Sequence, residues 1–86
     1  MRVFIPDALQ SYTDQQRMVE AEAATLTELL EVLDQHYPGI RFRMIDEQDD
    51  VRPHIAFFVR GEKTFNLNED LTGCDEVVIM QALSGG

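Results

Sequence analysis

The sequence predicts a two-layer α+β fold, in which one long amphipathic helix packs against a mixed sheet of four to five strands. Three observations support this prediction. A leucine-rich segment over residues 25–37 has the spacing of an amphipathic helix. Short β-prone segments lie on both sides of that helix in the sequence. The chain has 86 residues, which suits a single domain with one modest core.

The first two strands are expected near the N-terminus. Residues 2–5 form a short apolar run, which Pro6 ends because proline has no backbone N–H to donate. The polar segment 7–15 is interpreted as a turn. In residues 16–23 apolar and polar side chains alternate, as is typical of a half-buried strand. We expect these two strands to pair as a hairpin.

The helix over residues 25–37 is the best-defined element of the sequence. Thr25 can cap its N-terminus, and Glu28 follows three residues later, as in a capping box. Pro38 and Gly39 end the helix. The side chains that share one face, and that should pack on the sheet, are Leu26, Leu29, Leu30, Leu33 and Tyr37.

The second half of the sequence alternates strands and turns. Residues 40–52 are mixed and charged, and we interpret them as a loop with one short helical turn or strand. Residues 55–60, 63–65 and 77–82 are expected to be strands, with a turn at Gly61 and Glu62. The helical crossover allows the last strand to lie parallel to the first. The domain is therefore expected to span residues 1–82, with a flexible tail over residues 83–86.

The charge of the chain is strongly negative. Sixteen acidic residues against seven basic ones give a formal net charge of −9. A polyanion is repelled by nucleic acid and by anionic membranes, so neither is an expected partner. The charge can attract a basic protein surface or simply keep the chain soluble. No apolar segment has the length of a signal peptide or a membrane span, which predicts a cytoplasmic protein.

The sequence offers few residues for catalysis or metal binding. Cys74 is the single cysteine, which excludes an internal disulfide. It stands in a predicted turn with no basic neighbour to lower its pKa, so a packing role is expected. His36 and His54 lack ligand-like spacing with Cys74, and no metal site is expected. The paired acids of the charged loop are interpreted as solvated side chains.

Three segments resemble the ThiS/MoaD family of ubiquitin-like sulfur carriers, whose fold is the β-grasp. Residues 55–62 resemble the family's central strand and glycine-containing turn, and residues 75–79 its acidic turn into the last strand. Residues 82–86 resemble its terminal small-residue run, which ends here in Gly85 and Gly86. The resemblance covers the whole chain. The stretch 38–55 is most similar to the CysO-like subgroup used in cysteine synthesis, since molybdopterin-synthase small subunits usually lack it.

The resemblance implies a chemistry at the carboxylate of Gly86. A MoeB/ThiF-type adenylating enzyme would use ATP to convert this carboxylate into an acyl-adenylate. Sulfur would then displace AMP and leave a thiocarboxylate, which donates its sulfur to a biosynthetic acceptor for cysteine, molybdopterin, thiamin or a similar product. The accepting enzyme would be cysteine synthase-like or the large subunit of molybdopterin synthase. The chain would be a protein co-substrate, not an enzyme, and would bind no cofactor itself.

Two groups of residues are expected to serve that chemistry. The tail residues Ala82, Leu83, Ser84 and Gly85 would thread a narrow channel of the partner, because glycine and small side chains let the backbone approach closely. Phe58 and Met80 would form an apolar partner-binding patch on the open face of the sheet, if their strands alternate as predicted. Alternatively, a loop simply covers Phe58.

Three other functions remain open from the sequence. The chain could be the small subunit of a molybdopterin synthase, with its tail held permanently in the large subunit. It could be a ubiquitin-like protein modifier, joined through Gly86 to lysines of its targets. It could also be an inert interaction domain, whose function would survive loss of Gly85 and Gly86.

Overall fold

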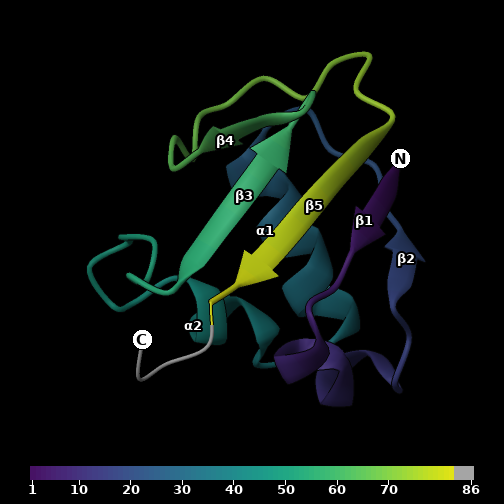
Figure 1. Cartoon of the computed structure of the whole chain (residues 1–86), viewed down its shortest axis with the longest axis vertical. Helices are drawn as coiled ribbons and strands as arrows, with labels where there is room; N and C mark the ends of the chain where they lie inside the picture. The colour runs from purple at the N-terminus through teal and green to yellow at the C-terminus, as the bar shows by residue number, and fades with distance from the viewer. Residues whose placement is uncertain (83–86) are drawn as a thin grey trace.

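A computed structural model describes residues 1–82 of the chain, as a five-stranded mixed sheet with helices on one side (Figure 1). The predicted two-layer α+β fold is confirmed. None of the described helices is long and apolar enough to cross a membrane. The elements are, in order, β1 (Arg2–Phe4), the 3-10 helix η1 (Asp7–Thr13), β2 (Met18–Glu20), α1 (Leu26–His36), α2 (Ile40–Met44), β3 (Ile55–Val59), β4 (Glu62–Thr64) and β5 (Glu76–Gln81).

The sheet has the strand order β2-β1-β5-β3-β4. β1 pairs antiparallel with β2 and parallel with β5, which confirms the predicted hairpin and the predicted parallel pairing of the first and last strands. β3 pairs antiparallel with β5 and with β4. The last strand therefore lies in the middle of the sheet, with a hydrogen-bonded neighbour on each side.

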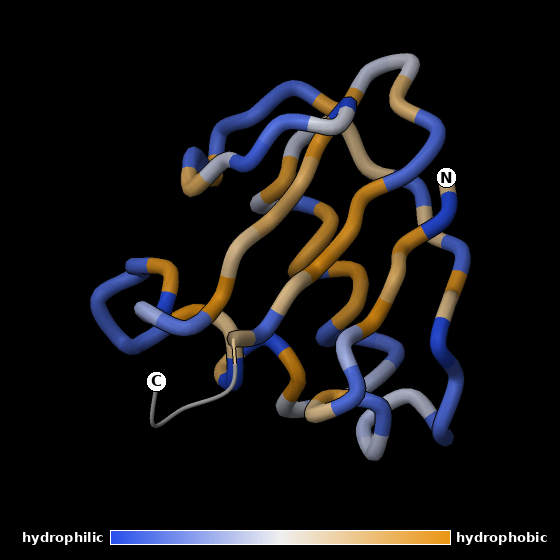
Figure 2. The backbone as a smooth tube through the Cα atoms, viewed as in Figure 1, coloured by the Kyte–Doolittle hydropathy of each residue, from blue (hydrophilic) through white to orange (hydrophobic). Residues whose placement is uncertain are grey.

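Helix α1 supplies one half of the core. The side-chain oxygen of Thr25 accepts a hydrogen bond from the backbone N–H of Glu28 at 3.2 Å, so the predicted N-cap is present. The four leucines of the predicted stripe are all buried. They pack in one cluster with inward side chains of the three central strands, and the hydrophobic segments of β3 and β5 run in front of α1 (Figure 2). Strand residues in this cluster include Val3, Ile55, Phe57, Val59, Val77 and Ile79.

The segment after β1 corrects one prediction. Residues 7–15 were expected to be a turn, but Asp7–Thr13 forms the 3-10 helix η1. Leu9 is buried in the main core, and the hydroxyl of Thr13 is buried while donating to the carbonyl of Gln16 at 2.9 Å. Two buried side chains four residues apart in a polar segment give too weak a period to be read as a helix.

The turn between β3 and β4 lies one residue earlier than predicted. Arg60 and Gly61 have φ values of 54° and 78°, the left-handed conformation that a tight hairpin turn needs at both central positions. Glu62 already belongs to β4 and lies opposite Val59. The guanidinium of Arg60 donates to the carbonyls of Asp70 and Thr72, at 2.8 and 2.6 Å. These bonds tie the hairpin turn to the segment that leads into β5.

The charged segment after α1 contains the short helix that was one of its predicted forms. In α2 the side chains of Ile40 and Met44 are buried, whereas that of Phe42 is 54% exposed. A tight loop follows, in which one carboxylate oxygen of Asp46 accepts the backbone N–H groups of Gln48 and Asp50 at 2.9 and 3.0 Å. These backbone donors stabilise the charged form of the carboxylate and lower its pKa below the ordinary 3.8.

The Asp46 loop predicts a specific dependence of stability on pH. Because the pKa of Asp46 is lower in the folded state, its contribution is fully present above pH 3.8 and is lost as the pH falls through the lowered value. Asp46→Asn keeps an acceptor oxygen but cannot ionise. We expect the variant to have a lower urea midpoint than the parent at neutral pH, and the two midpoints to converge in acid. A difference that stays constant down to low pH would contradict a role for the ionised carboxylate.

Candidate docking face and C-terminal segment

The predicted tail begins directly after β5, the central strand of the sheet. The backbone N–H of Ala82, directly after β5, donates to the carbonyl of His54 at 2.8 Å. Ala82 itself is exposed. The other predicted tail residues, Leu83, Ser84, Gly85 and Gly86, lie outside the described residues. The structure therefore holds the base of this segment at one end of the sheet, next to the loop that precedes β3.

The two predicted patch residues lie on the sheet face opposite α1. In β3, Phe57 is buried against the helix side, so Phe58 points to the other face. In β5, Ile79 is buried and Met80 is 50% exposed. The register places Ala56 opposite Met80 and Phe58 opposite Val78, so Phe58 and Met80 are diagonal neighbours across two paired strands. Both side chains line one shallow groove, which Ala82 also lines.

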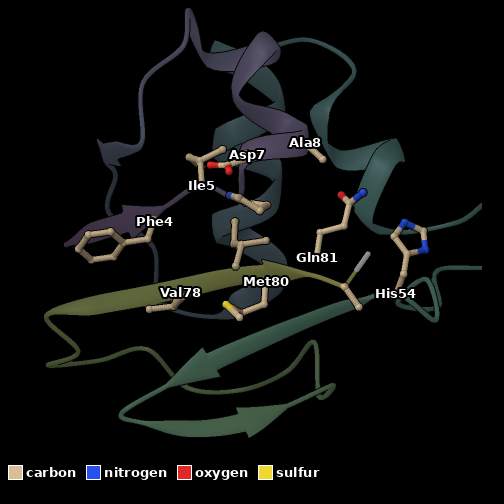
Figure 3. Close-up of a pocket in the computed structure, with 11 residues that line it drawn as sticks. Phe4, Ile5, Asp7, Ala8, His54, Val78, Met80 and Gln81 are labelled. Carbon is tan, nitrogen blue, oxygen red and sulfur yellow. The ribbon is translucent and has the colours of Figure 1, made fainter. Parts of the chain in front are cut away.

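The patch is larger than the sequence indicated. Phe4 pairs with Val78 in the parallel register and lies on the same face, as Figure 3 shows for Phe4, Val78 and Met80. Phe65 is 54% exposed and lines the same shallow groove as Phe58. The alternation of residues 2–5 is the signal that could have identified Phe4. We call this surface the apolar sheet face; its residues are Phe4, Ala56, Phe58, Phe65, Val78 and Met80.

Charged side chains border the apolar sheet face. Arg2 and Glu76 form an ion pair at 2.9 Å beside Phe4 in the β1–β5 register. The ammonium of Lys63 lies 5.4 Å from the centroid of the Phe65 ring. Clustered aromatic and methionine side chains with a charged border are typical of protein–protein interfaces. The composition of this face is thus of the kind that docks another protein, and the face lies next to Ala82 at the base of the tail.

Cys74 and His36, two other residues considered from the sequence, make local contacts with backbone carbonyls. The thiol of Cys74 is partly buried and donates to the carbonyl of Glu76 at 3.0 Å. A ring nitrogen of His36 lies 3.0 Å from the carbonyl of Val32, one helical turn earlier. Among residues 1–82, no group of three or more histidine, cysteine, aspartate or glutamate side chains is arranged to hold a metal ion.

Comparison with protein families gives a match to a model described as the ThiS family, over residues 3–86. One similar chain comes from a solved complex of BexX and CysO from Amycolatopsis orientalis. It has 27% sequence identity to this chain and a TM-score of 0.88, and the match covers 99% of this chain and 98% of the other. CysO from Mycobacterium tuberculosis has 26% sequence identity to this chain and a TM-score of 0.87. The match covers 95% of this chain and 98% of that CysO.

A third similar structure is SAMP1 from Haloferax volcanii, with 24% identity and a TM-score of 0.82, covering 100% of this chain and 98% of that one. At this identity the likeness supports the fold alone, which is the predicted β-grasp. The comparison with curated proteins gives no significant match. The extent of the family match includes both Gly85 and Gly86.

Proposed function

Because this chain belongs to the ThiS family, we propose that it is a sulfur carrier whose reacting group is the carboxylate of Gly86. Family membership and the CysO structures support the broader statement that it is a ubiquitin-like sulfur carrier or modifier. The observation that carries the proposal is the position of β5. This strand lies in the centre of the sheet, contributes Val78 and Met80 to the apolar sheet face, and is followed in the sequence by the diglycine segment that the family match includes.

The proposed reaction has two steps. In the first, a carboxylate oxygen of Gly86 attacks the α-phosphate of ATP on an adenylating enzyme of the MoeB/ThiF type, forming an acyl-adenylate and releasing pyrophosphate. In the second, hydrosulfide released by a sulfur donor attacks the acyl carbon, AMP leaves and the sulfur loses its proton, which yields the thiocarboxylate. Activation is needed because a carboxylate has no good leaving group. The thiocarboxylate is then a sulfur nucleophile for the accepting enzyme, for the same reason that a thiolate is.

The apolar sheet face is the proposed docking surface for the adenylating enzyme. Its exposed Met80 is two residues before Ala82, so a protein bound there also meets the start of the tail. Glycine at positions 85 and 86 lets the backbone pass close to the walls of a narrow channel. Ala82 and Ser84 have small side chains that keep the approach slim, and Leu83 can fill an apolar pocket of the channel.

For the accepting enzyme we propose a cysteine synthase-like protein. The CysO of the Amycolatopsis orientalis complex matches 99% of this chain, so the match includes the segment from α2 to β3 that first suggested this subgroup. That same structure is a complex, so this relative binds a second protein, BexX.

The proposal is tested by ATP–pyrophosphate exchange with a MoeB/ThiF-type enzyme. We expect the full chain to stimulate exchange, because reversible adenylation of Gly86 returns pyrophosphate to ATP. A chain lacking Gly86 should fold equally well and stimulate no exchange above background. If this shortened chain stimulates exchange as well as the full chain does, Gly86 is not the adenylated group. If the adenylated chain instead transfers Gly86 to lysines of other proteins, with release of AMP, the chain is a modifier.

A further inference from the structure

A groove at the base of the tail gathers positive charge in this acidic protein. It is lined by residues of η1, α2, the segment before β3 and the end of β5: Ala8, Leu9, Phe42, Arg43, Arg52, His54 and Gln81. We call it the basic groove. His54 and Gln81 lie next to each other, across from Ala8 (Figure 3). Since the carbonyl of His54 accepts the N–H of Ala82, the groove begins where the proposed tail begins.

Neither arginine of the basic groove is paired with a carboxylate in the described part of the chain. The chain carries a net charge of −9 and only seven basic residues, yet two of them line this groove. The Asp46 carboxylate is held by the backbone N–H groups of Asp50 and Gln48, which lower its pKa, whereas the charge of Arg52 makes only a small contribution to that lowered pKa and forms no ion pair with Asp46. The ion pairs among residues 1–82 lie elsewhere and join Met1 to Glu22, Arg2 to Glu76, and Arg41 to Asp49.

Arg52 is held in place in a way that leaves its charge available. Its Nε–H donates to the carbonyl of Phe42 at 2.8 Å, and its guanidinium lies 4.7 Å from the centroid of the Phe42 ring. Within residues 1–82 its two terminal nitrogens make no hydrogen bond. A guanidinium fixed on an aromatic ring, with its outer N–H groups free, fits a carboxylate in the two-pronged geometry. Arg43, one residue after Phe42, is exposed and adds a second positive charge.

We propose that the basic groove binds aspartate or glutamate side chains of the protein that receives the tail. This inference rests on the proposed function and adds a second contact to the apolar sheet face. The two arginines of the groove, unpaired within residues 1–82, attract a carboxylate locally, so charge complementarity favours an acidic side chain. A nucleic acid is a long polyanion and is repelled by the net charge of −9 on the chain as a whole. The nucleotide of the reaction is an unsuitable occupant. A tail that is extended in the partner's channel, as proposed above, would place Gly86 about 13 Å beyond Ala82 and so take the nucleotide away from the groove.

The first experiment needs no sulfur chemistry. The full chain, labelled with ¹⁵N, is titrated at low salt with a blocked glutamate-rich peptide and, separately, with inorganic phosphate. We expect the peptide to shift the signals of Phe42, Arg43, Arg52 and Gln81, including the side-chain Nε–H of Arg52, and to leave Arg17 unchanged. Unchanged groove signals would overturn the proposal. So would a response to phosphate alone, which would make the groove a phosphate site.

The second experiment connects the basic groove to the partner. Arg43→Glu and Arg17→Glu change the net charge equally, and Arg17 is exposed but lies outside the groove. In the pyrophosphate-exchange assay we expect Arg43→Glu to raise KM for the carrier about tenfold or more, with kcat unchanged and a weaker dependence of KM on salt. Arg17→Glu should change KM less than about twofold. Equal effects of the two variants would contradict a specific role, whereas an inactive parent chain would contradict the proposed function instead.

Discussion

Phe57→Ala is expected to lower the free energy of unfolding by about 3–5 kcal/mol, the usual cost of truncating a fully buried phenylalanine. Phe57 is completely buried in β3, between β5 and β4, and packs against the leucines of α1. A domain of this size has a total stability on the order of 5–15 kcal/mol, so the variant should be largely unfolded in mild urea. Urea denaturation followed by circular dichroism measures the effect.

The adjacent Phe58 provides the matched control. It has the same side chain and the same strand but lies on the apolar sheet face, where part of it is exposed. We expect Phe58→Ala to cost about 1 kcal/mol or less in stability. Its effect should fall on the partner, with KM for the adenylating enzyme raised about thirtyfold, as for a central interface residue worth about 2 kcal/mol. If Phe58→Ala lowers stability as much as Phe57→Ala does, and the variant that is still folded in the absence of urea has an unchanged KM, Phe58 serves the core and the apolar sheet face is not a docking surface.

Adding one alanine after Gly86 is expected to reduce activation of the tail by about a hundredfold or more, since small misplacements of a reacting group have effects of this size. The addition turns the carboxylate of Gly86 into an amide. It also moves the terminal carboxylate about 3.5 Å along an extended chain, past the position where it can meet the nucleotide. The rate of AMP formation in the presence of a sulfur donor measures the effect.

Ser84→Ala is the control for the added alanine, because it changes the tail's composition and leaves its length and its carboxylate as they were. We expect this variant to be activated within about twofold of the parent, as alanine is no wider than serine and keeps the segment slim. If the extended chain is activated as fast as the parent, the reaction does not depend on the position of the Gly86 carboxylate.

The regular parts of the fold could be predicted because each has a repeating signal. The leucines of α1 recur on one helical face, and Thr25 and Glu28 identify the start of the helix. The alternation in β3 and β5 assigned Phe57 and Phe58, and Ile79 and Met80, to opposite faces, as the structure has them. A signal of this kind needs only neighbouring residues, so one sequence is enough to see it.

The irregular parts could not be predicted, because tertiary contacts decide them. Leu9 is one buried side chain in a polar segment, and its contact with the core is what distinguishes η1 from a turn. In α2 the apolar residues at 40, 42 and 44 alternate as in a strand, although the buried pair, Ile40 and Met44, has helical spacing. The basic groove joins residues as distant as Ala8 and Gln81, and no local pattern announces it.

The measurement that tests the central proposal most directly is the mass of the C-terminal peptide after incubation with ATP, a sulfur source and the adenylating enzyme. Oxidation of Met80, one of the four methionines of the chain, adds an oxygen to this peptide, and that nearly matches the mass gained when sulfur replaces oxygen. A thiol-selective label, localised by fragmentation, separates the two. We predict a labelled sulfur on Gly86, and none in the chain lacking Gly86. A full chain that is adenylated but never carries sulfur at Gly86 would contradict the sulfur-carrier function and leave the modifier function in its place.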